Sequence, residues 1–129
     1  MKNQRIAGEL KVSTGDMVDM DLSVIIFEED GIQIYYCPAL DLSGYGKTEV
    51  EASESLKVVL AEYFDYTAKK KTLKDDLTQL GWQLKKNLKK KMTAPTMSKL
   101  LETNDNFKRI FDKHSFRKTD TRIKIPAIA

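Results

Sequence analysis

The chain has 129 residues, of which 41% are apolar and 32% charged, and its formal net charge is +3. This length and composition predict one domain with one modest core. The single cysteine excludes an internal disulfide bond, and the apolar runs reach only about six residues, far too few to cross a membrane. No apolar stretch follows the first charged residues, as it would in a signal peptide, so we expect a protein of the cytoplasm.

The charge changes sign near the middle of the chain. Residues 1–66 contain 13 acidic and 5 basic side chains, whereas residues 67–129 contain 6 acidic and 17 basic ones. The first half therefore has a net charge of −8 and the second a net charge of +11. An acidic surface attracts basic proteins, whereas a basic surface attracts nucleic acid or folds back onto the acidic half. We therefore divide the chain into an acidic core, 1–68, and a basic extension, 69–129.

Short strands are predicted before the first helix. Apolar and β-branched residues predict strands over 5–12, Leu22–Phe27, Ile32–Cys37 and 42–46. The Asp30-Gly31 pair between two of them is a strong signal for a hairpin turn.

Side chains of the strand over Ile32–Cys37 alternate between two faces. We expect Ile32, Ile34 and Tyr36 to face the helix that follows. Tyr35 and Cys37 are then expected to point outward, near Tyr45. Tyrosine is frequent at the centres of protein interfaces, so this outward face is a candidate contact surface.

A long amphipathic helix is predicted over 49–68. Thr48 and Glu51 have the spacing of a capping box at its start. Its apolar residues recur at intervals of three and four: Ala52, Leu56, Val59, Leu60, Tyr63 and Tyr66. We expect this helix to pack on one face of the sheet.

The second half predicts shorter elements. A helix over 73–80 ends at Gly81, and residues 82–93 either continue it or form a basic ribbon of two strands, 82–86 and 88–93. We favour the ribbon, because glycine inside a helix costs about 1 kcal/mol. Short helices are predicted over 97–103 and 105–113. The alternating segment 122–128 is predicted to return to the sheet as an edge strand. The fold class is therefore α+β: a small antiparallel sheet, one main helix on one face and a basic C-terminal extension.

Residues that could carry catalysis or bind a metal are scattered. Most acidic residues of the first half lie in predicted turns, where they do not converge as a metal site requires. Cys37 and His114 are the only cysteine and histidine, too few for a zinc site, and Cys37 has no neighbouring base in the sequence. We therefore predict no enzymatic activity, no cofactor and no metal.

The densest basic patch lies after Gly81 and contains Trp82, Lys85, Lys86, Lys89, Lys90 and Lys91. Lysines neutralise phosphates, and a tryptophan can stack on a base, so this patch is a candidate nucleic-acid site. In the alternative interpretation, Trp82 packs in the core and the lysines form a solvated surface. The near absence of arginine here favours that alternative.

Three features follow one another between Asp21 and Tyr66: the acidic hairpin turn, the run Cys37-Pro38-Ala39-Leu40, and Gly46 to Ala52, which matches a G-x-T-x-x-E-A helix start. In this order, the segment resembles the HicB-type antitoxins of bacterial toxin–antitoxin pairs. The resemblance implies a β-β-β-α-β unit, a partial ribonuclease-H-like fold without catalytic activity, that binds and blocks a small basic HicA-type ribonuclease toxin. Many members also bind operator DNA through a C-terminal domain, but this chain departs from that order of elements because a predicted strand ends it.

Two functions are therefore expected. In the first, an antitoxin-like dimer or larger assembly binds the toxin through its acidic half, with these contact residues: Glu28, Glu29, Asp30, Tyr35, Cys37 and Tyr45. In the second, the protein is a nucleic-acid-binding regulator that uses the basic half, and one protein can combine both roles.

Overall fold

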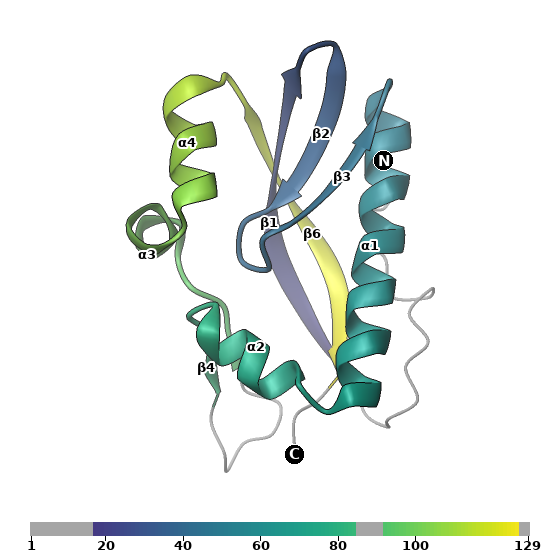
Figure 1. Ribbon diagram of the computed structural model, residues 1–129, viewed down its shortest axis with the longest axis vertical. Helices are drawn as coiled ribbons and strands as arrows, with labels where there is room; N and C mark the ends of the chain where they lie inside the picture. Colours follow the sequence, from purple (N-terminus) through teal and green to yellow (C-terminus); the bar gives the residue numbers. More distant parts are fainter. Residues whose placement is uncertain (1–16, 85–91, 127–129) are drawn as a thin grey trace.

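The computed structural model describes residues 17–84 and 92–126. In this part of the chain, a four-stranded antiparallel sheet has the order β3-β2-β1-β6, and β4 and β5 form a separate ribbon (Figure 1). The strands are β1 (Met17–Glu29), β2 (Ile32–Cys37), β3 (Leu42–Gly46), β4 (Gln83–Leu84), β5 (Met92–Thr93) and β6 (Arg117–Pro126). The helices are α1 (Glu49–Lys70), α2 (Leu73–Gln79), α3 (Met97–Thr103) and α4 (Asp105–Lys113). The predicted α+β class is confirmed.

The hairpin between β1 and β2 turns at the predicted Asp-Gly pair. Asp30 has φ 54° and Gly31 has φ 80°. Two successive positive φ values are typical of the turn that matches the twist of a two-residue hairpin. The turn sets the register of the hairpin, in which Glu29 lies opposite Ile32.

The end of the chain returns to the sheet, as predicted. β6 pairs antiparallel with β1, from Met17 opposite Pro126 to Ile26 opposite Arg117. β1 and β6 are both longer than the strands predicted from the sequence, because the two strands pair with each other along their whole added length. The predicted strand over 5–12 lies outside the described residues.

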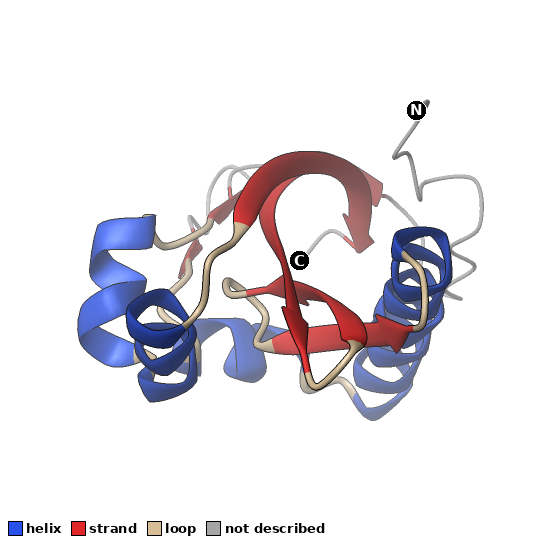
Figure 2. Cartoon of the chain, turned by 90° about the horizontal axis from the view of Figure 1, so that it is seen from above, coloured by secondary structure: helices blue, strands red, loops and turns tan. Residues whose placement is uncertain are grey.

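Helices cover both faces of the sheet, which differs from the prediction. Seen from above, β1 and β6 arch over the other two strands, with α1 at one side and α3 and α4 at the other (Figure 2). A Cβ atom on Gly44 would lie 2.2 Å from the backbone nitrogen of Leu56, so α1 contacts the bare backbone of β3. Tyr36 lies on the opposite face, where its ring centroid is 6.5 Å from that of Phe107 in α4.

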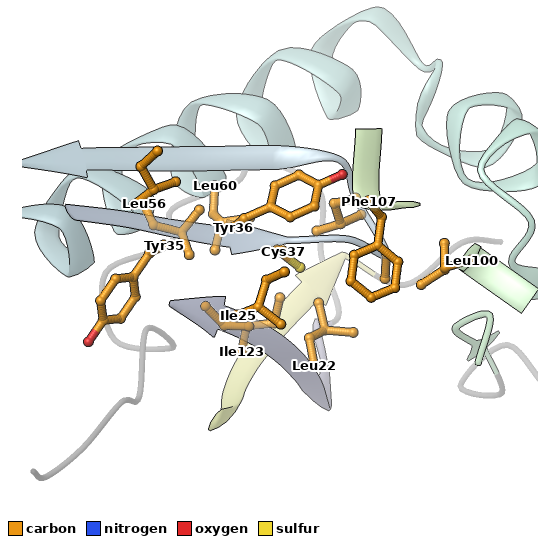
Figure 3. Close-up of a cluster of buried hydrophobic side chains, with 14 of the residues drawn as sticks. Leu22, Ile25, Tyr35, Tyr36, Cys37, Leu56, Leu60, Leu100, Phe107 and Ile123 are labelled. Atoms are coloured by element: carbon orange, nitrogen blue, oxygen red, sulfur yellow. The ribbon is translucent and has the colours of Figure 1, made fainter. Parts of the chain in front are cut away.

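The core lies between these layers. Its fully buried large side chains include Ile25, Tyr36, Leu60, Phe64 and Phe107, which come from β1, β2, α1 and α4. In the close-up, side chains of the sheet, α1, α3 and α4 gather in one cluster (Figure 3). The acidic and basic halves of the sequence therefore share one sheet and one core.

Local signals position the helices. The Thr48 hydroxyl accepts a hydrogen bond from the Glu51 amide at 3.1 Å, as the capping box predicts. The Glu51 carboxylate accepts a hydrogen bond from the amide of Lys47 at 2.8 Å, whereas a capping box predicts the amide of Thr48 as the donor. Gly81 follows α2 with φ 96°, and the predicted ribbon is present where it is described, with Gln83 opposite Thr93.

Candidate protein-binding surface

The turn after β2 begins at Cys37, whose side chain lies in the core. Cys37 is only 1% exposed, and burial raises the pKa of its thiol to about 12. The Leu40 amide donates to the Cys37 carbonyl at 3.2 Å, which closes the turn. The expectation that Cys37 points outward is therefore wrong, and a partner cannot reach its thiol while the protein stays folded.

Tyr35 and Tyr45 lie on opposite faces of the sheet. Tyr35 pairs with Gly44, so its side chain lies on the α1 face, where it is only 9% exposed. Burial and the negative charge of Glu49 raise the pKa of its hydroxyl. Tyr45 pairs with Ile34 on the other face and is 57% exposed. The outward direction predicted for Tyr35 is wrong, whereas Tyr45 is exposed as expected.

The reversal of the two faces has a physical cause. Gly44 and Gly46 alternate along β3 on one face, and neither has a side chain to keep a helix away. α1 therefore packs on this face, beside Tyr35 and Cys37. The face that carries Ile34 and Tyr36, which the sequence analysis assigned to α1, is covered by α4 instead. The glycine alternation is the signal that could have placed the helix correctly.

The acidic hairpin turn has basic neighbours from the other half of the chain. Glu28 and Asp30 are exposed. The Glu29 carboxylate lies 3.9 Å from nitrogen atoms of both Arg109 and His114 at α4. Part of the predicted contact surface is therefore already occupied by the chain's own basic side chains.

Two further arginines connect the halves. Arg122 of β6 donates two hydrogen bonds to Asp21 of β1, from Nε at 2.7 Å and from Nη2 at 3.3 Å. Arg117 donates to Glu49 at the start of α1. The carboxylates raise the pKa of both guanidinium groups, which stay charged. The basic half thus folds back onto the acidic half, one of the two possibilities that the charge split left open.

A partly buried polar network, which the sequence analysis missed, joins β2 to α4. The Tyr36 hydroxyl donates to Asp41 and accepts from the Asn104 amide group at 3.0 Å. Asn104 also caps α4, because its Oδ1 accepts from the Phe107 amide at 3.0 Å. Burial, together with the hydrogen bond to Asp41, raises the pKa of the Tyr36 hydroxyl. No sequence motif links Tyr36 to Asn104, which is 68 positions away.

A groove of about 420 Å³ opens beside this network, between the turn after β2 and the ends of α2, α3 and α4. Asp41 and Asn104 line it, but both are engaged with Tyr36. Across residues 17–84 and 92–126, no three His, Cys, Asp or Glu side chains converge in a way that could hold a metal ion.

Trp82, the aromatic residue of the predicted nucleic-acid patch, is not accessible to a nucleic acid. Trp82 is buried, and its Nε1 donates to the carbonyl of Ala39 at 2.9 Å. The indole therefore fixes the turn after β2 and cannot stack on a base. The other members of the patch lie outside the described residues: Lys85, Lys86, Lys89, Lys90 and Lys91.

The outer side of α1 exposes apolar side chains. Val50 is 72%, Val58 55% and Tyr66 61% exposed, and Glu54 and Glu62 are exposed between them. The buried side chains of α1 occupy the opposite side of the helix: Ala52, Leu56, Leu60, Phe64 and Thr67. The exposed side of α1 therefore alternates apolar and acidic side chains along its length.

Comparison with known proteins gives no family: no family model, curated protein or solved structure matches the chain significantly. The resemblance to HicB-type antitoxins therefore stays a prediction. Among the described residues, no helix has the length and apolar character needed to cross a membrane.

Proposed function

We propose that this protein is a non-catalytic binding protein of the HicB antitoxin type, which binds a small basic ribonuclease and blocks it. One observation carries the proposal. In the acidic half, Cys37 is buried and the buried Tyr36 donates a hydrogen bond to Asp41. By contrast, the apolar side chains of Val50, Val58 and Tyr66 are exposed.

The motif residues support a structural role. Cys37 lies in the core, Gly44 and Gly46 allow α1 to approach β3, and Thr48 caps α1. These residues shape the fold, and the Cys37 thiol is not accessible. A binding function, which needs a surface and not a reactive pocket, fits this use of the motif better than catalysis does.

The surface supports a basic protein as the partner. Val50, Val58 and Tyr66 of α1 are exposed in the half of the chain that has a net charge of −8. Apolar contacts stabilise a complex, and complementary charge speeds the encounter and orients the partners. A small basic ribonuclease of the HicA type has the required charge.

The alternative, a nucleic-acid-binding regulator, has less support. Trp82 is buried, and each of the three arginines of the basic half contacts a carboxylate of the acidic half. Arginine makes the most frequent specific contacts with base edges, so these contacts weaken the case for sequence-specific binding.

The proposal includes a cytoplasmic location and an assembly of two or more copies. The one cysteine is a buried free thiol, as is common in a reducing compartment.

The test uses the product of the adjacent open reading frame, which we expect to be a short basic protein. The full chain is mixed with it, complex formation is followed by calorimetry, and RNA cleavage is measured with and without the chain. We expect a stable complex and loss of cleavage at a stoichiometric ratio. An adjacent frame without a basic product, or a product that does not bind and cleaves RNA unhindered, would overturn the proposal.

A further inference from the structure

We infer that the outer side of α1, and not the sheet or the hairpin turn, is the surface on which a basic protein docks. This surface, the α1 outer face, consists of Val50, Glu54, Val58, Glu62 and Tyr66, which follow one another at intervals of four residues. The inference deepens the proposed function and rests on it, because it identifies where the basic partner binds.

The first argument is the composition of this face. Residues four apart are neighbours on one side of a helix, so apolar and acidic side chains alternate along it. Valine is a poor choice for a solvated helix position, because its branched side chain loses freedom against the preceding turn. Val50 and Val58 also remain mostly exposed in the described structure, at 72% and 55%. Contact with a partner explains both valines, because it would bury them.

The second argument is that the other candidate surfaces are partly occupied by elements of the chain itself. α1 covers the face of the sheet that carries Tyr35, and α4 packs on the opposite face. Glu29 of the hairpin turn lies close to Arg109 and His114. By contrast, α1 packs mainly against β3 and β2, and its side chains Val50, Val58 and Tyr66 stay exposed.

The third argument is charge. Between Glu49 and Asp65, α1 carries five acidic side chains and one lysine. That lysine, Lys57, pairs with Glu54 at 3.4 Å, and Glu62 is exposed. The acidic surplus favours a partner that surrounds an apolar contact with lysine or arginine.

The same charges disfavour a second copy of this chain as the occupant. Two α1 helices that cross antiparallel at Val58 would place Glu54 of one copy against Glu62 of the other. A parallel pair would place each glutamate against its own counterpart. Both arrangements bring like charges together at the edge of an apolar contact, which costs binding energy. A basic partner replaces this repulsion with attraction.

The test compares two matched double variants, each of which removes one exposed apolar side chain and reverses one exposed glutamate. The first is Glu54→Lys with Val58→Ala on α1, and the second is Glu28→Lys with Tyr45→Ala at the hairpin end of the sheet. Binding of the basic product of the adjacent frame is measured by calorimetry at two salt concentrations. Far-ultraviolet circular dichroism monitors folding.

We expect the α1 variant to bind at least ~30-fold more weakly, from the loss of an apolar contact and a charge pair of about 1 kcal/mol each. We also expect its affinity to depend less on salt, while the hairpin variant binds within about threefold of the wild type. Because all four side chains are exposed, both variants should fold. Val58→Ala alone, which improves helix propensity, provides a second test if the α1 double variant does not fold.

The possible failures are distinguishable. If the unmodified chain does not bind the basic protein, the proposed function fails. If the unmodified chain binds and the α1 variant binds equally well, or the hairpin variant is the weaker one, the function stands and the inference is overturned. If the α1 variant instead loses self-association in light scattering while it keeps the basic partner, the occupant is a second copy and the inference is again overturned.

Discussion

Replacing Gly44 with alanine tests the contact that sets the fold of the acidic half. An added Cβ would lie 2.2 Å from the Leu56 nitrogen, 2.6 Å from the Ala52 oxygen and 2.7 Å from the Leu56 Cα. All three atoms belong to the backbone of α1. They cannot rotate away as the end of a side chain can, so α1 must move away from β3 or the sheet must bend.

The size of the effect follows from this geometry. Inserting one methyl group into a filled interior costs typically about 1–3 kcal/mol, and a rigid backbone neighbour places this site at about 3 kcal/mol. Gly31 provides the control, because an added Cβ there meets nothing within 4 Å. Gly31→Ala therefore costs only the strain of its positive φ, about 1 kcal/mol. At about 4 °C per kcal/mol for a chain of this size, we expect Tm losses of about 12 °C and about 4 °C.

Urea titrations followed by circular dichroism measure both variants against the wild type. The reasoning requires Gly44→Ala to be the less stable by about 2 kcal/mol, with an unchanged dependence on urea. Equal stability of the two variants would mean that α1 does not lie against β3. In that case the assignment of Tyr35 and Cys37 to the α1 face would also be wrong.

Four further predictions address the turn after β2 and the last strand. Trp82→Phe removes the donor to the buried Ala39 carbonyl, so the free energy of unfolding should fall by about 1–3 kcal/mol; unchanged stability would contradict the bond. Because the pKa of the Cys37 thiol is raised to about 12, the thiol stays protonated and should resist alkylation at pH 8 until urea unfolds the chain. Rapid labelling of the folded protein would refute this burial. Ionisation of Cys37 should leave the free energy of unfolding unchanged below about pH 9, where the thiol is protonated in both the folded and the unfolded chain. As the pH rises toward 12, the unfolded chain loses this proton first, so the free energy of unfolding should fall, which urea titrations at several pH values measure. Deleting residues 119–129 should lower Tm because β1 loses most of its partners in β6, whereas an unchanged melting curve would count against the pairing.

Local signals in the sequence predicted the elements well. Thr48 determines where α1 begins, and the Asp30-Gly31 pair determines where β1 turns into β2, because each acts on the backbone within a few residues. The return of the chain's end to the sheet could also be predicted, since an alternating strand needs a partner and the sheet otherwise has an open edge. The favoured ribbon over 82–93 depended on one local fact, the cost of Gly81 inside a helix.

Arrangement in space was harder to predict, because alternation cannot choose between two apolar faces. In β2, Ile34, Tyr35, Tyr36 and Cys37 are all buried, so both faces of the strand are in the core. Which face of the sheet packs against α1 depends on the residues that each face presents. α1 packs on the face with Gly44, where no side chain separates the helix from the strand backbone. The hydrogen bonds from Asn104 to Tyr36 likewise join residues that are distant in the sequence, and no spacing rule predicts such a contact.

The positions of the arginines explain how one chain can carry a charge split and still present an acidic surface. Each arginine of the basic half contacts a carboxylate of the acidic half: Arg109 with Glu29, Arg117 with Glu49 and Arg122 with Asp21. The guanidinium group binds a carboxylate through two donors at once, which suits it to such contacts better than lysine.

These contacts lie at the hairpin turn, at the first turn of α1 and along β6, and none of them reaches the middle of α1. Within α1, the ion pairs are made by lysines of the same helix: Lys57 pairs with Glu54 near the middle, and Lys69 pairs with Asp65 near the C-terminal end. Pairs between exposed neighbours on a helix contribute little and are easily exchanged for contacts with a partner. On the α1 outer face, Glu54 and Glu62 therefore lie on either side of Val58, where a basic protein would gain both a charge contact and an apolar one.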